Sequence, residues 1–175
     1  MSPPLPALST TPVRHPSSCC SVSLPLISLL NTLLPTPPRL TLSIGSGHGL
    51  LEALLLHHYP TRSRSFYGVE VSAPTPVNLF LAEQNTLTVA GTWGMVDDGL
   101  LAEADGLMFV YPRQPSLARA YLEKWKGEVV VWIGPRADIE EFGPVFEKWG
   151  GGKEGKDMGA GMVDEGEGVW VYRGR

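Results

Sequence analysis

The sequence predicts an α/β fold, in which a doubly wound, mostly parallel sheet carries helices on both faces. Three observations lead to this prediction. Apolar segments with a period of two residues alternate with segments whose leucines recur every three or four residues. Proline and glycine separate these segments. The apolar runs at residues 106–112 and 127–135 are typical of strands buried on both faces, and strands that alternate with helices form βαβ crossovers.

The individual elements follow from this patterning and from the residues that end each run. The expected strands are residues 39–45, 65–71, 86–91, 106–112, 127–135 and 168–173. The expected helices are residues 24–34, 49–60, 75–85, 116–126 and 137–149, the last one broken near Gly143 and Pro144. Residues 150–168 hold eight of the 20 glycines and are expected to form a flexible loop. Whether this loop contains a further edge strand stays open.

A change in composition divides the chain into a disordered lead, residues 1–22, and a single domain, residues 23–175. Residues 1–38 hold nine of the 16 prolines and one charged residue, Arg14. The lead itself is rich in Ser, Thr and Pro, and it buries too little apolar surface to offset the entropy of ordering. Its lack of acidic residues is typical of organelle targeting, but arginine is scarce, so we expect a cytoplasmic protein and leave targeting open.

Charge and cysteine content exclude several classes of protein. The net charge is -4 and the pI is near 5.5, which argues against binding nucleic acid through a basic surface. No apolar run approaches the roughly 20 residues that span a bilayer, so no membrane is expected. The adjacent Cys19 and Cys20 form neither a disulfide framework nor a zinc site. No other ligands cluster near His57 and His58, and no metal is therefore expected.

The strongest motif follows the first predicted strand. Gly45, Gly47 and Gly49 alternate in a loop that leads directly into a helix. Glycine is needed where the backbone turns with positive φ, or where a ligand touches the main chain. The helix start behind the loop offers unpaired N–H groups. Glu70 ends the second strand, 21 residues after Gly49, where an acidic residue accepts hydrogen bonds from a ribose diol. Together these features predict a site for a nucleotide-like ligand.

The spacing G-x-G-x-G differs from the dinucleotide fingerprint G-x-G-x-x-G. Together with the following LLEALL, it resembles motif I of the class I S-adenosylmethionine-dependent methyltransferases, and GVEV resembles that family's second motif. The resemblance covers residues 25–173 in layout. It implies S-adenosyl-L-methionine as cofactor. It also implies that Gly45, Ser46, Gly47 and Gly49 lie against the amino-acid part and that Glu70 binds the ribose hydroxyls.

Three segments depart from the family's pattern. Ser43 stands where the family usually has an acid, two positions before the first glycine. AGTWG follows the third strand in place of an acid, and Trp93 is the candidate that would stack on adenine. YPRQP follows the fourth strand in place of N/D-P-P-Y/F, which disfavours methylation of amides and nucleobase amines. Tyr111 and Arg113 of that segment lie where substrate should approach, and Arg113 is suited to a carboxylate or phosphate.

Each candidate also has an explanation that needs no ligand. The glycines could form a tight turn, Glu70 a solvated strand end, and Trp93 a core or interface aromatic. His48, inside the loop, either packs over the cofactor or faces solvent, and a role as proton acceptor stays open. The remaining acidic pairs are expected to be solvated charges at helix ends: Asp97, Asp98, Glu140 and Glu141.

The function that this pattern favours is methyl transfer from S-adenosyl-L-methionine to a small-molecule substrate. No catalytic residue is assigned. The alternative is a non-catalytic module of the same fold that binds or scaffolds. An NAD-dependent oxidoreductase is disfavoured by the glycine spacing. The chain has no room for a separate substrate domain, so the lead is a candidate lid that excludes water. A homodimer or a protein partner that completes the site is left open.

Overall fold

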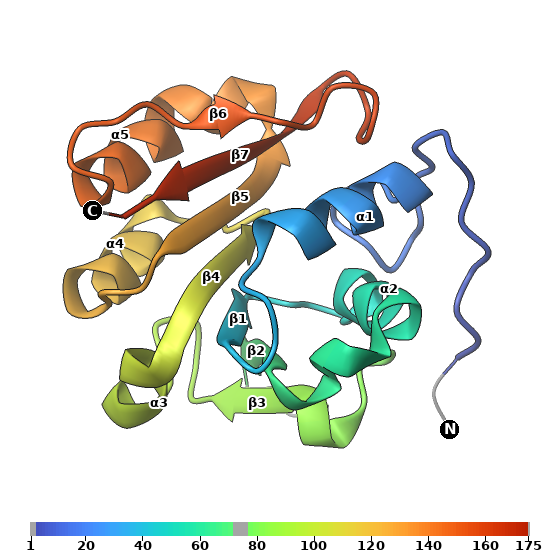
Figure 1. Ribbon diagram of the computed structural model, residues 1–175, viewed down its shortest axis with the longest axis horizontal. Coiled ribbons are helices and arrows are strands. Elements are labelled where there is room, and N and C mark those ends of the chain that lie inside the picture. Colours follow the sequence, from blue (N-terminus) through green and yellow to red (C-terminus); the bar gives the residue numbers. More distant parts are fainter. Residues whose placement is uncertain (1–2, 72–76, 175) are drawn as a thin grey trace.

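The structure, a computed structural model that describes residues 3–71 and 77–174, contains a seven-stranded sheet with helices on both faces (Figure 1). The strands are β1 (Leu40–Ile44), β2 (Phe66–Val71), β3 (Thr86–Val89), β4 (Ala104–Val110), β5 (Val129–Pro135), β6 (Lys156–Asp157) and β7 (Glu167–Arg173). The helices are α1 (Leu24–Leu33), α2 (Leu50–His58), α3 (Asp98–Glu103), α4 (Pro115–Lys124) and α5 (Ile139–Trp149). In this described part of the chain, no helix has the length and apolar content to cross a membrane. The predicted α/β fold class is confirmed.

The strand order is β3-β2-β1-β4-β5-β7-β6. Strands β1 to β5 pair in parallel, whereas β7 runs antiparallel to both β5 and β6. From β1 the chain proceeds outward to β3, and it then returns to place β4 on the other side of β1. In open α/β sheets ligands bind outside the carboxyl ends of the strands, at such a reversal of strand order. The segments that follow β1, β2 and β4 therefore define the candidate site.

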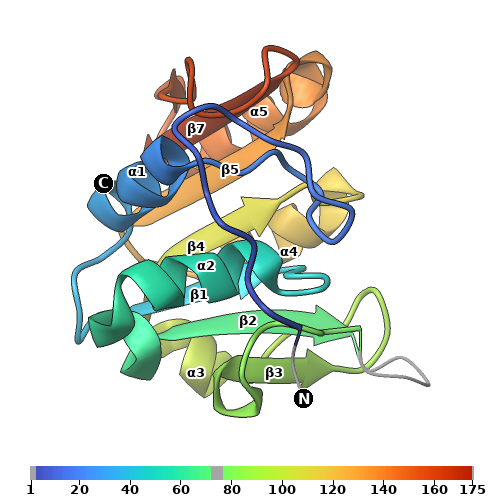
Figure 2. The same cartoon turned by 90° about the vertical axis from the view of Figure 1, so that its right-hand side faces the viewer.

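Two apolar layers hold the helices against the sheet. Helices α1 and α2 pack on one face around Met108 and Val131, and α3, α4 and α5 pack on the other around Leu107 and Trp132. Figures 1 and 2 show these two groups of helices on opposite sides of the strands. Trp132 is fully buried and stacks on Phe142 of α5, with 5.5 Å between ring centroids. Both faces of the central strands are thus covered, as their unbroken apolar sequences predict.

Helix starts in this chain follow ordinary capping chemistry. Ser23 accepts a hydrogen bond from the Leu26 N–H group at the start of α1. Asp97 accepts from two N–H groups and begins α3, a short helix that the patterning did not predict. Asp97 and Asp98 are exposed there, and Glu140 and Glu141 are exposed in the first turn of α5. The prediction of solvated helix-end charges is correct at all four positions.

The predicted helix at residues 75–85 is wrong. Its first two residues lie outside the described part, and residues 77–85 are irregular apart from one 3-10 turn. The Asn78 side chain competes with helical hydrogen bonding, because its amide donates to the Leu81 carbonyl at 2.7 Å and accepts from the Leu81 N–H group at 3.0 Å. Two further N–H groups of this segment donate to the carbonyl of His48. The segment therefore packs against the glycine loop.

The predicted break near Gly143 and Pro144 is also wrong, because α5 is continuous. Pro144 removes one backbone hydrogen bond, but Phe142 and Phe146 on either side of it are buried against the sheet and hold the helix together. Packing here outweighs the local cost of proline.

The glycine-rich loop at residues 150–168 contains the further edge strand that the sequence left open. It is β6, which pairs with β7. Asp157 of β6 accepts hydrogen bonds from the N–H groups of Gly159 at 2.8 Å and Val169 at 3.2 Å. Part of the loop that was expected to be flexible is therefore attached to the sheet.

Residues 3–22 of the lead, for which the composition predicts disorder, lie against the rest of the domain. Residues 3–22 contain only one isolated β-bridge, yet Cys20 and Ser21 are buried. Apolar side chains of the lead pack against the layer formed by α1 and α2. The Ser21 hydroxyl donates to Glu167, 146 residues away, at 2.5 Å. The lead buries apolar surface against the rest of the domain. The composition of the lead alone does not reveal this surface.

Candidate functional site

The glycine loop connects β1 to α2 at the reversal of strand order. Gly45, Gly47 and Gly49 have φ angles of 77°, 57° and 75°, all in the left-handed region that favours glycine. A Cβ atom on Gly45 or Gly47 would meet nothing within 4 Å, whereas one on Gly49 would overlap Asn78 and Leu81. The first two glycines therefore border open space, and the third allows close packing of the chain segment behind the loop.

Replacing Gly49 by alanine is expected to lower the free energy of unfolding by roughly 2–3 kcal/mol, because backbone strain and steric overlap act together. Gly47→Ala has the same kind of strain but meets open space, so its expected loss is about 1 kcal/mol. Urea unfolding of both variants measures the difference. Equal losses in the two variants would contradict the packing role of Gly49.

Glu70, in β2, faces the glycine loop. Its Oε2 atom accepts a hydrogen bond from the Gly47 N–H group at 2.5 Å, and its Oε1 atom accepts one from the Val71 N–H group at 2.8 Å. The side chain remains partly exposed. The structure thus brings together the two parts of the predicted nucleotide site, and it places a carboxylate beside the open space above Gly45 and Gly47.

The other predicted loop residues point elsewhere. The Ser46 hydroxyl is buried close to Gly68 of β2, and it has no hydrogen-bond partner among the described residues. The Ser46 N–H group donates to the Val69 carbonyl at 3.1 Å, so this residue joins the loop to the sheet. The His48 side chain is exposed, and its carbonyl accepts two hydrogen bonds from the segment before β3.

A second carboxylate, Glu52, lies directly behind the loop in the first turn of α2 and is only 1% exposed. It accepts a hydrogen bond from the Ser43 hydroxyl at 2.6 Å. Burial raises the pKa of Glu52 to about 7, and the charge of Glu70 acts in the same direction. The sequence analysis did not assign this residue. Its signal was available, since Glu52 is the one acidic residue in an otherwise apolar stretch of helix.

Tyr111 follows β4 and has an unusual backbone conformation for its type, with φ at 49°. Its hydroxyl donates to Glu167 Oε1 at 2.5 Å, and burial raises the pKa of this hydroxyl. Glu167 is 1% exposed and also accepts from the N–H group and the hydroxyl of Ser21. Arg14 lies 3.4 Å from the same carboxylate. Glu167 thus joins the lead, the end of β4 and the start of β7, a connection that the sequence analysis missed.

The lead passes over the carboxyl ends of the central strands. Figure 2 shows it running past α2 and looping beside the arrowhead end of β4. Partial burial and the charges of Glu52 and Glu70 raise the pKa of the Cys19 thiol, and the charge of Arg113 lowers it. The Cys19 residue is nevertheless exposed to solvent. Arg113 itself is exposed, as expected for a residue on the substrate side.

Trp93 lies in the turn that follows β3 and is 60% exposed. Within residues 3–71 and 77–174 it makes no aromatic pair or side-chain hydrogen bond, so the structure does not join it to Glu70. The prediction of an adenine-stacking role stays a prediction. The indole is nevertheless free of the core, at the same edge of the sheet as the glycine loop.

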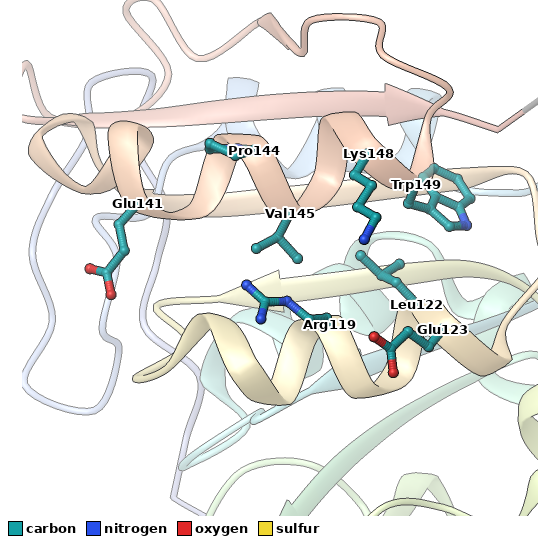
Figure 3. A pocket seen from close by; sticks show the side chains of 8 residues that line it. All are labelled: Arg119, Leu122, Glu123, Glu141, Pro144, Val145, Lys148 and Trp149. Carbon is teal, nitrogen blue, oxygen red and sulfur yellow. The ribbon is translucent and has the colours of Figure 1, made fainter.

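A separate groove of about 670 Å³ lies between α4 and α5 (Figure 3). Its lining combines apolar side chains with charges of both signs: Arg119, Leu122, Glu123, Glu141, Pro144, Val145, Lys148 and Trp149. None of the predicted ligand-binding residues lines it. The groove is therefore a surface feature apart from the glycine loop.

Comparison with known proteins relates the chain by its fold. No family model and no curated protein matches the sequence. Among solved structures, precorrin-6y C5,15-methyltransferase from Geobacter metallireducens superposes with a TM-score of 0.59 at 9% identity, over 95% of this chain and 98% of that one. A precorrin 8w decarboxylase from Methanobacterium thermoautotrophicum gives 0.58 at 14% identity, over 97% and 100%. The methyltransferase domain of bacterial CtHen1-C gives 0.57 at 13% identity, over 86% and 95%.

These neighbours confirm the Rossmann-like methyltransferase fold that the motifs implied. Their identities of 9–14% show a shared fold and do not by themselves show a shared reaction. The names of the neighbours illustrate this point, since one is a decarboxylase and two are methyltransferases.

Proposed function

We propose that this protein binds S-adenosyl-L-methionine at the carboxyl ends of β1, β2 and β4 and transfers its methyl group to a small-molecule acceptor. The observation that carries the proposal is the open space above Gly45 and Gly47, beside the Glu70 carboxylate. Cβ atoms at those two glycines would occupy that space, so the loop is built for close approach of a ligand to the main chain. The fold shared with known methyltransferases supports the same conclusion.

Each part of the site has a role in this proposal. The loop at Gly45 and Gly47 lies against the amino-acid part of the ligand, and Glu70 accepts hydrogen bonds from the ribose hydroxyls. In the absence of ligand, the Gly47 N–H group satisfies the carboxylate that the sugar would reach. Trp93 offers an exposed aromatic face for the adenine. Ser46 contributes through its backbone, because its hydroxyl is buried away from the open space.

When bound, S-adenosyl-L-methionine supplies an electrophilic methyl carbon, which forms a bond to the acceptor atom as its bond to sulfur breaks and sulfur keeps the electron pair. The protein contributes mainly by holding the acceptor in line. Tyr111 is suited to this positioning, because its backbone conformation and its hydrogen bond to Glu167 restrict the ring. A general base is needed only for an acceptor that still carries its proton at the working pH.

The proposed acceptor is small because the lead already occupies space over the strand ends. Arg113, exposed beside this region, favours an acceptor with a carboxylate or phosphate group. The absence of an N/D-P-P-Y/F segment after β4 argues against amides and nucleobase amines. The residues of the lead nearest to this region, including Cys19, would shield the reacting atoms from water.

A non-catalytic module is the second candidate, and one observation favours it. Both oxygens of Glu70 already accept hydrogen bonds within the protein, so the loop is stable without a ligand. In a scaffold protein these bonds would serve structure alone.

Calorimetric titration with S-adenosylhomocysteine, S-adenosylmethionine and NAD tests the proposal. The wild-type protein is expected to bind the two sulfur nucleotides and not NAD. Glu70→Ala is expected to weaken binding about 10- to 100-fold, because hydrogen bonds to a charged group are lost. Glu83→Ala, an exposed acid outside the site, is the matched control and should leave affinity unchanged. A folded wild-type protein that binds neither sulfur nucleotide would refute methyl transfer and favour the scaffold.

A further inference from the structure

Glu52 is a buried carboxylate that lacks a cationic partner. It is 1% exposed in α2, and its carboxylate accepts a hydrogen bond from the neutral Ser43 hydroxyl at 2.6 Å. Among residues 3–71 and 77–174, no lysine, arginine or histidine forms an ion pair with it. Burying an ionised carboxylate with one neutral donor is unfavourable, and most buried charges are paired. A stable core at this position would be served better by leucine, the residue type that surrounds Glu52 in the helix.

The position of Glu52 connects it to the glycine loop. Ser43 lies two residues before Gly45, and Glu52 lies three residues after Gly49, so their hydrogen bond closes the base of the loop. Glu70 accepts from the Gly47 N–H group of the same loop, and its charge raises the pKa of Glu52. A cation bound at the loop would therefore be attracted by both carboxylates.

We propose that Glu52 receives the α-ammonium group of the bound ligand, with Ser43 holding the carboxylate in place. The inference rests on the proposed function, because it concerns the amino-acid part of S-adenosylmethionine. An ammonium group is the partner that the buried carboxylate lacks, and a charge-assisted hydrogen bond in a region shielded from water is strong. Glu52 would then determine specificity for adenosine ligands that carry an amino-acid group.

The burial of Glu52 has a consequence for access. Only 1% of Glu52 is exposed, so an ammonium group reaches the carboxylate only if the side chains around it move.

Two ligands that differ in the amino-acid group separate this role from general support of the site. S-adenosylhomocysteine carries the ammonium group, whereas 5′-methylthioadenosine keeps the nucleoside and sulfur without it. Glu52→Gln is expected to weaken binding of S-adenosylhomocysteine about 10- to 100-fold and to change binding of 5′-methylthioadenosine less than about 2-fold. Glu103→Gln, an exposed acid at the end of α3, is the matched control.

A double variant distinguishes loss of the carboxylate from damage to the structure of the loop. Ser43→Asp with Glu52→Gln moves the carboxylate to the other side of the same hydrogen bond, and it is expected to restore most of the affinity for S-adenosylhomocysteine. Urea unfolding without ligand establishes that each variant is folded.

The possible results are distinct. Equal weakening of both ligands by Glu52→Gln, without rescue by the double variant, would show that Glu52 only supports the loop and would overturn the inference. Unchanged binding of S-adenosylhomocysteine would overturn it too, while leaving the proposed function intact. A wild-type protein that binds neither ligand would overturn the proposed function itself.

Discussion

Replacing Glu167 by alanine is expected to lower the free energy of unfolding by about 3–5 kcal/mol, the usual cost of breaking a buried polar network. The carboxylate accepts hydrogen bonds from Ser21 and from the Tyr111 hydroxyl, and it is 1% exposed. Its removal leaves the Tyr111 hydroxyl and the Ser21 N–H group without their acceptor. Arg14 contributes little to the loss, because its own side chain is 62% exposed.

Urea unfolding measures this loss, and hydrogen exchange at the Ser21 amide shows whether the lead is released. Glu165→Ala is the matched control, since Glu165 is exposed two residues earlier in the chain. Its expected loss is below about 0.5 kcal/mol. If Glu167→Ala unfolds like the control and Ser21 stays protected, the lead is held by other contacts and the connection through Glu167 is unimportant.

The stability of the ligand-free protein is expected to fall by roughly 3 kcal/mol between pH 4.5 and pH 7 through Glu52 alone. The pKa of Glu52 is about 7 in the folded state against an ordinary value of 4.5. The folded state therefore binds the proton more tightly than the unfolded chain. Its stabilising effect is fully present below the unfolded pKa and is lost as the pH rises through the folded one.

Other carboxylates titrate in the same range, so the comparison with Glu52→Gln isolates this effect. The difference in unfolding free energy between wild type and variant should change by roughly 2–3 kcal/mol between pH 5 and pH 8, with the variant favoured at the higher pH. Glu70 on β2 and Cys19 and Cys20 on the lead are the titratable groups whose charges act with that of Glu52. A difference that stays constant with pH would show that folding leaves the pKa of Glu52 unchanged.

Both predictions concern residues near the carboxyl ends of the central strands. Glu167 holds the lead to Tyr111 after β4, and Glu52 lies behind the loop after β1. Cys19 lies on the lead, two residues before Ser21, which donates hydrogen bonds to Glu167. If ligand entry requires movement of the lead, then Glu167→Ala should raise the rate of binding even as it lowers stability.

The pattern of the sequence was sufficient for the fold class and for the glycine loop between β1 and α2. Alternating apolar periods identify β1 to β5, because the period of a strand or helix is a local property of the chain. The spacing of Gly45, Gly47 and Glu70 led to the prediction that loop and carboxylate hold one ligand, and in the structure the Gly47 N–H group donates to Glu70. Such motifs can be recognised in the sequence because a short turn at the end of a strand permits few backbone conformations.

Tertiary structure decided the features that depend on distant partners. The segment before β3 is irregular because Asn78 and the His48 carbonyl take its hydrogen bonds, although its apolar spacing suits a helix. The lead packs on the domain through contacts such as that of Ser21 with Glu167, and Glu52 is buried beside Ser43. Local sequence specifies which conformations a segment prefers, whereas burial and pairing depend on residues brought together only when the whole sheet forms.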